Sequence, residues 1–178
     1  MKLLSEQKAL ARLQLLKSDF KSKIVENYEH RAKSCATCET PGACCLDEHF
    51  VNVHISRLEA VAVKQALAAM PQEKQDKIYA KIVSAVERYD LAEAGDTFAK
   101  TYACPLFEKG TGCIVHATGK PLPCIQHACY ENAADLPPDE LLAQKELEID
   151  TLNRRAYGSL QPLLPIPLAI RVGNQPIG

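Results

Sequence analysis

The sequence lacks the features of several large classes of protein. Its 178 residues carry 21 lysines and arginines against 22 aspartates and glutamates, so no excess of positive charge is present to bind nucleic acid. No run of about eighteen apolar residues could cross a membrane. After Met1–Leu4 the chain turns polar without the apolar region of a secretory signal. We therefore expect a cytoplasmic protein that binds neither nucleic acid nor membranes.

Common enzyme motifs are also missing. There is no glycine-rich phosphate loop, no Gly-x-Ser-x-Gly motif and no His-Glu-x-x-His motif. Cys35 and Cys38 have the spacing of a thiol redox pair, but the pattern lacks the preceding strand and following helix that activate such a thiol. The sequence leaves open whether the protein is an enzyme, and it offers no residue as a catalytic group.

What the sequence does contain is eight cysteines in two groups of four. The first group is Cys35, Cys38, Cys44 and Cys45, and the second is Cys104, Cys113, Cys124 and Cys129. Residues 46–103 contain no cysteine. Structural zinc sites and four-iron clusters each take four sulfur ligands, and in a reducing cytosol such spacing favours metal over disulfides. All eight cysteines are therefore candidate metal ligands.

The adjacent pair Cys44 and Cys45, here called the doublet, restricts the kind of site. Neighbouring side chains point to opposite sides of a strand and diverge on a helix, so one ion rarely binds both. We expect the doublet to serve two metals, or two irons of one cluster. Either arrangement would join the two cysteine groups into a composite site.

The second group is predicted to lie on a metal-binding knuckle. Residues 104–107 and 113–116 resemble two short strands around a turn at 108–112, whose glycines would expose backbone N–H groups toward sulfur. His127 follows Cys124 by three residues, so it is either a substitute ligand or a hydrogen-bonding neighbour of the ligands. We expect the other histidines in and between the cysteine groups to be structural; they are His49, His54 and His116.

Two stretches resemble a known family. They are CATCETPGACC at 35–45 and CPLFEKGTGCIVHATGKPLPCIQHAC at 104–129. Together they resemble the cysteine-cluster family of the CxxCxxCC type, described as a zinc- or iron-chelating domain, and each of its eight cysteines has a counterpart here. A similar cluster in flagellin lysine methylases is associated with an iron–sulfur centre. The resemblance covers about residues 35–130 and implies that the cysteines bind metal.

The remaining sequence predicts a helical scaffold. Apolar residues at steps of three and four predict helices, and a capping-box pattern at Ser56 predicts where the second begins; the ranges are 3–32, 57–70, 71–93 closed by Gly95, and 139–157 closed by Gly158. Alternation predicts a strand at 50–55. The helices at 57–70 and 71–93 form a pair that could bring the two cysteine groups together.

The predicted fold is a single mainly α domain over 1–178, of the α+β kind with a small β hairpin. It is a helical domain with a cysteine-rich metal-binding lobe at 35–130. The proline-rich tail at 159–178 shows no helical period, so it either packs in extended form or is loose and available to a protein partner.

The predicted function is metal binding through the eight cysteines, as an iron–sulfur cluster or as zinc. The Cys104–Pro105 dipeptide and the doublet favour iron–sulfur, whereas the knuckle is equally suited to zinc. Two alternatives remain open. One is a structural zinc module that binds a protein partner through its helices or tail, and the other is a redox or radical enzyme that uses the cluster.

Overall fold

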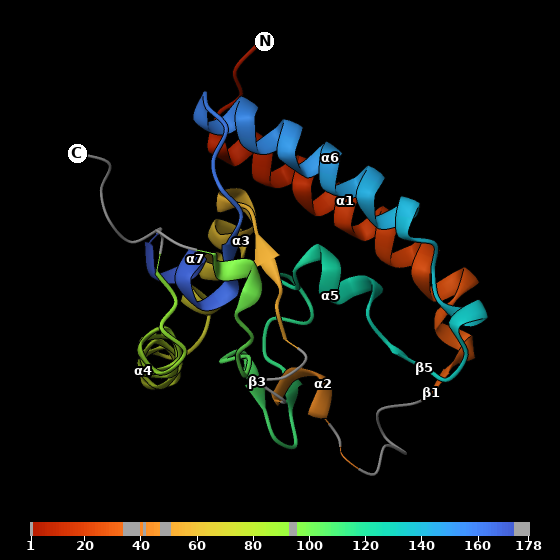
Figure 1. Cartoon of the computed structure of the whole chain (residues 1–178). Helices are drawn as coiled ribbons and strands as arrows, with labels where there is room; N and C mark the ends of the chain where they lie inside the picture. The colour runs from red at the N-terminus through yellow and green to blue at the C-terminus, as the bar shows by residue number, and fades with distance from the viewer. Residues whose placement is uncertain (1, 34–39, 41, 47–50, 93–95, 173–178) are drawn as a thin grey trace. The chain divides into compact units, whose positions relative to one another are not determined.

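The computed structural model describes residues 2–33, 40, 42–46, 51–92 and 96–172. It is mainly α-helical with short strands, which confirms the predicted fold class (Figure 1). The chain forms two compact units, each built from separate segments. Unit 1 comprises Met1–Pro41 and Pro121–Leu160, and unit 2 comprises Gly42–Lys120 and Gln161–Gly178. No helix in the described ranges is both long enough and apolar enough to cross a membrane.

Unit 1 is organised by two long antiparallel helices, α1 (Glu6–Asn27) and α6 (Asp139–Tyr157), which lie side by side (Figure 1). Their apolar faces meet because Leu13, Phe20 and Ile149 are buried at helical spacing. α6 has the predicted bounds and ends at Gly158, whose positive φ of 77° suits glycine.

The first helix is shorter than predicted. α1 starts after Ser5, whose side chain accepts a hydrogen bond from the backbone N–H of Lys8, and it ends at Asn27 rather than at residue 32. A 3-10 turn, η1 (Glu29–Arg31), and the strand β1 (Ala32–Lys33) take the remaining residues. The helical pattern of the sequence continues into this segment, but Ala32 and Lys33 are extended instead, because they pair with another strand.

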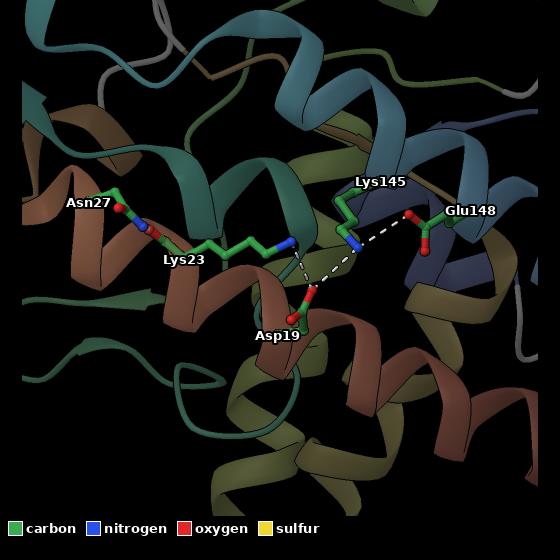
Figure 2. A network of polar contacts seen from close by, with 5 residues as sticks. All are labelled: Asp19, Lys23, Asn27, Lys145 and Glu148. Atoms are coloured by element: carbon green, nitrogen blue, oxygen red, sulfur yellow. Dashed lines mark hydrogen bonds and ion pairs between the residues drawn. The ribbon is translucent and has the colours of Figure 1, made fainter.

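A polar network joins α1 to α6 beside the apolar contact. Figure 2 shows Lys145, whose ammonium lies 3.4 Å from a carboxylate oxygen of Asp19 and 3.2 Å from one of Glu148. Lys145 is only 9% exposed. Its aliphatic stem is therefore buried, while its ammonium charge is paired with the two carboxylates. The hydrogen bond from Lys145, followed by the charge of Lys23, lowers the pKa of the exposed Asp19 carboxyl.

The rest of unit 1 carries two of the cysteines. A short helix, α5 (Leu122–Gln126), packs against α1 and α6 and is followed by the strand β5 (Cys129–Tyr130) and the turn η4 (Ala133–Asp135). β5 pairs with β1 in antiparallel fashion, with Lys33 opposite Cys129. The helix at Cys124 was not predicted, although Pro121 before it and Pro123 in its first turn are compatible with a helix start.

Unit 2 contains a helical pair, α3 (Arg57–Ala68) and α4 (Gln72–Arg88). The capping box at Ser56 is confirmed, since its side chain and that of Glu59 each bind the other's backbone N–H. Pro71 precedes α4 as its N-cap and is not its first helical residue. α4 ends at Arg88, earlier than predicted, and Gly95 lies outside the described residues.

Short elements complete unit 2. They are α2 (Ala43–Leu46), β2 (His54–Ile55), η3 (Thr97–Ala99), β3 (Phe107–Glu108), β4 (Gly112–Cys113), β6 (Leu164–Pro165) and α7 (Ile166–Val172). β3 pairs with β4 as the predicted hairpin, and β2 pairs with β6. The strand predicted at 50–55 is only β2 within the described residues, and Phe50 lies outside them.

The C-terminal segment corrects the prediction of an extended or loose tail. Residues 166–172 form α7, which packs against α3 and α4, and five consecutive residues from Ile166 to Ile170 are buried. A helix that is apolar all round shows no amphipathic period, which is why the pattern was missed. Pro167 lies in the first turn, where a missing N–H costs little.

Tyr102, which follows the helical pair in the sequence, is hydrogen-bonded to the segment that precedes the pair. Its backbone N–H donates to the carbonyl of Val51 at 2.9 Å, and its buried hydroxyl donates to the carbonyl of Val53. The same hydroxyl accepts from the backbone N–H of Ile166 at 3.0 Å. The segments before and after the helical pair therefore meet at this side chain, as the sequence predicted for the two ends of the insertion.

His54 is the buried histidine of unit 2. Its Nε2 lies 2.9 Å from Thr97 Oγ1, and its ring stacks on Phe98 with centroids 3.9 Å apart. Burial lowers the pKa of His54, and this effect is opposed in part by the Asn52 carbonyl and by the charge of Asp96. The folded chain therefore favours the neutral imidazole.

Replacing Tyr102 with phenylalanine should reduce the free energy of unfolding by about 1–2 kcal/mol, because the buried hydroxyl makes two hydrogen bonds that phenylalanine cannot. Chemical denaturation measures the change. Tyr157→Phe is the matched control, since its hydroxyl contacts Glu6 at an exposed position and its loss should cost less than about 0.5 kcal/mol. Equal effects of the two substitutions would contradict the structural role of Tyr102.

Acidification should destabilise unit 2 through His54. Because the folded-state pKa lies below the ordinary value of 6.5, the unfolded chain binds the proton more readily, and stability falls as the pH drops through that value. His54→Gln should flatten this part of the stability profile, measured as denaturation midpoints from pH 7.5 to pH 5. An unchanged slope in the variant would show that other groups cause any acid sensitivity.

Candidate metal centre

Cys104 begins a tight turn that directs backbone N–H groups back toward it. The N–H of Phe107 donates to the Cys104 carbonyl at 3.3 Å, and the N–H of Leu106 donates to the Cys104 sulfur. Donors of this kind stabilise a thiolate more than a thiol, because the thiolate is the stronger acceptor.

Cys113 begins a second turn with the same two contacts at the same offsets. The N–H of His116 donates to the Cys113 carbonyl at 3.1 Å, and the N–H of Val115 donates to the Cys113 sulfur. The two turns, here called the twin turns, are held together by the pairing of Phe107 with Cys113 in the β3–β4 hairpin. The predicted hairpin is therefore present, but β3 and β4 share only Phe107 and Cys113 with the strands predicted at 104–107 and 113–116. The N–H groups near the sulfurs belong to Leu106 and Val115, and not to the glycine-containing turn at 108–112 from which they were predicted.

The helical pair positions this hairpin. The carboxylate of Glu108 on β3 lies 3.2 Å from the ammonium of Lys74 on α4. A Cβ added at Gly119, after the second turn, would lie 3.1 Å from Ala66 Cβ and 3.2 Å from Val63 Cα, both on α3. A residue without a side chain therefore allows the second turn to pack closely on α3.

The surroundings of the two thiols oppose their ionisation. Burial raises the pKa of Cys104 to about 12, despite the Leu106 N–H, and the nearby Cys113 raises it further. Burial also raises the pKa of Cys113, against the effects of the Val115 N–H and Lys120. The protein alone thus favours thiols at neutral pH, and two thiolates here would require a positive charge such as a metal ion beside them.

The doublet lies next to this hairpin in the fold. Cys44 and Cys45 are in α2, and the carbonyl of Cys45 accepts a hydrogen bond of 2.7 Å from the backbone N–H of Cys104. Gly42, just before α2, packs on the ring of Phe107, since a Cβ added there would lie 1.9 Å from the ring atom Cζ. Two contacts therefore fix the doublet's backbone beside the first of the twin turns.

Gly42 and Phe107 are the residues of this region that sequence reasoning missed. Gly42 has a positive φ of 83°, and a glycine two residues before the doublet was the available signal for a close backbone approach. Nothing in the sequence named the aromatic ring as its neighbour, because the two residues are far apart along the chain.

Cys124 and Cys129 are in unit 1, on α5 and β5. His127 is the C-cap of α5 and lies between them. Cys35 and Cys38, together with His49, fall outside the described residues. In the sequence, Cys35 follows two residues after Lys33, which pairs with Cys129.

The described cysteines form neither a disulfide with one another nor a complete metal site. In the described parts of the chain, no three His, Cys, Asp or Glu side chains are gathered closely enough to hold a metal ion. The structure therefore brings the backbones of Cys45 and Cys104 together, and the sulfurs of Cys104 and Cys113 close enough to interact electrostatically, without closing a site around them.

Comparison with known proteins found no matching family model, no similar curated protein and no similar solved structure. The candidate centre must therefore be judged on its own residues.

Gly42→Ala should destabilise unit 2 more than Gly110→Ala. Both glycines have positive φ, 83° and 85°, which costs alanine roughly 1–2 kcal/mol, but only Gly42 meets another atom, the Phe107 ring. The overlap should add about 1–3 kcal/mol at Gly42, measured by chemical denaturation. Equal losses would mean that the packing of Gly42 on Phe107 contributes nothing to stability.

Proposed function

We propose that this protein binds metal through its cysteines, as an iron–sulfur cluster or as zinc. The observation that carries the proposal is the pair of twin turns at Cys104 and Cys113. In each turn a backbone N–H two residues after the cysteine favours its thiolate, and the β3–β4 hairpin joins the two turns. Metal-bound thiolates use such N–H donors, and hydrogen bonds to sulfur tune the metal centre.

The ordinary alternative is that these cysteines are small apolar residues that only fill space. A thiol sulfur is a weak acceptor, so that role gives no reason for two sulfurs to receive N–H donors in two turns of the same geometry. If both cysteines ionised, their negative charges would repel each other, and a shared cation would offset that repulsion. The arrangement is therefore better suited to metal ligands than to core packing.

The proposed ligands are the eight cysteines of the two groups, whose side chains metal binding would gather. Because ligand side chains are seldom gathered before the metal binds, binding and local folding are coupled. Metal would draw the side chains of the doublet toward the hairpin beside which their backbone lies. The cysteines require a reducing compartment to stay reduced, for which we propose the cytoplasm.

Between the two metals, we favour an iron–sulfur cluster. Cys44 and Cys45 are adjacent in the helical turn α2, where successive side chains point about 100° apart. Several irons of one cluster accept such divergent ligands more readily than one tetrahedral ion. The family of the CxxCxxCC type is described as chelating zinc or iron and does not decide between them, whereas the similar cluster of flagellin lysine methylases is associated with an iron–sulfur centre.

Two further roles stay proposals beside metal binding. A redox enzyme would use the same cluster to carry electrons, and a structural zinc module would present a protein-binding surface. For the second role, the buried α7 leaves little of the C-terminal tail accessible to a protein partner. In contrast, Leu15 on α1 and Leu147 on α6 are 72% and 67% exposed. A protein partner would therefore more readily use helices of unit 1 than α7.

Metal analysis and visible absorption of the full chain, purified without oxygen, test the proposal. We expect bound iron with acid-labile sulfide, or bound zinc in a colourless protein. Cys104→Ser and Cys113→Ser should each reduce bound metal at least several-fold, because each removes a ligand that receives an N–H donor. Thr111→Ser, at the exposed tip of the same hairpin, is the control and should retain wild-type metal.

Two results would contradict metal binding by these residues. The first is a wild-type chain that contains neither iron nor zinc after anaerobic purification and reconstitution. The second is wild-type metal content in both cysteine variants, which would remove the twin turns from the site.

A further inference from the structure

The two compact units group the cysteines differently from the two groups of four seen in the sequence. Unit 2 contains the doublet from the first group and Cys104 and Cys113 from the second, whereas Cys124 and Cys129 belong to unit 1. Each unit is compact by itself. Cysteines that are neighbours in the sequence are therefore not automatically neighbours in a site.

We propose that Cys44, Cys45, Cys104 and Cys113 form a four-cysteine metal site that is complete within unit 2 and requires neither Cys124 nor Cys129. This inference rests on the proposed metal binding and specifies which ligands act together. Four sulfurs are the number that a four-iron cluster takes, and different irons of one cluster can accept the divergent side chains of the doublet, so no ligand from unit 1 is needed.

Three contacts support this grouping, and all lie within unit 2. The Cys104 N–H binds the Cys45 carbonyl, Gly42 packs on the Phe107 ring, and β3 pairs with β4 to place Phe107 opposite Cys113. The backbone of the doublet is thus held beside Cys104 and beside the hairpin whose strand β4 carries Cys113.

The neighbours of Cys124 and Cys129 are different. α5, which carries Cys124, packs against α1 and α6, and Cys129 is paired with Lys33 of β1. These contacts hold the two residues to the long helices and the β1–β5 pair of unit 1. None of these contacts involves Cys44, Cys45, Cys104 or Cys113.

The first test compares double variants of the full chain by their iron, zinc and sulfide content after anaerobic purification. Cys44→Ser/Cys45→Ser and Cys104→Ser/Cys113→Ser should each lose the same fraction of the wild-type metal content. The variant with all four substitutions should lose no more metal than either double variant. Cys124→Ser/Cys129→Ser, with the same number and type of substitutions, is the discriminating variant, because it should retain the metal that the other two variants lose.

A second test avoids variants that fail to fold. The wild-type chain is treated with increasing chelator and a thiol-alkylating reagent, and intact-mass spectra count the labels on each molecule. We expect Cys44, Cys45, Cys104 and Cys113 to become alkylated together, over the same range of chelator concentration. The alkylation of Cys124 and Cys129 should not be coupled to that of these four residues. Peptide mapping of the labelled chain identifies the residues.

The outcomes separate the two proposals. Loss of all metal in Cys124→Ser/Cys129→Ser, together with all six described cysteines becoming reactive in one step, would overturn the self-contained site but leave metal binding intact. Unequal losses in the doublet variant and the hairpin variant would also overturn it. A wild-type chain without metal would overturn metal binding itself, and this inference with it.

Discussion

The candidate centre depends on the hydrogen bonds that close the helical pair of unit 2. The backbone N–H of Tyr102 reaches Val51, and that of Cys104 reaches Cys45, so two segments flanking α3 and α4 run beside one another. The Tyr102 hydroxyl extends this junction to Ile166 at the start of α7. Without these bonds, the doublet and the hairpin would be held together only by the packing of Gly42 on Phe107 and by the long cysteine-free segment between them.

The second constraint is the conflict between burial and charge at Cys104 and Cys113. Burial raises the pKa of both thiols, while a backbone N–H from the residue two positions later favours each thiolate. A bound cation would resolve the conflict by supplying the charge that burial removes from water. The same balance explains why one hairpin combines apolar neighbours, such as the buried Leu106 and Val115, with N–H donors to sulfur.

Local signals predicted the parts of the fold that depend on neighbouring residues. The bounds of α6, the capping box at Ser56 and the β3–β4 hairpin follow from patterns only a few residues long. The ends of α1 and α4 were predicted too far along the chain, because a helical pattern does not show where strand pairing or a turn begins to be more stable. α7 was missed since complete burial removes the alternation of polar and apolar faces.

The sequence by itself determined the candidate ligands, which are eight cysteines in two groups, and a glycine-containing hairpin within the second group. The tertiary structure alone decided which of them are neighbours: the Cys44–Cys45 doublet lies against the Cys104–Cys113 hairpin, while Cys124 and Cys129 belong to the other unit. The physical reason is that spacing along a chain sets only short-range geometry. Contacts between distant residues depend on how helices bury their apolar faces, which no cysteine motif encodes.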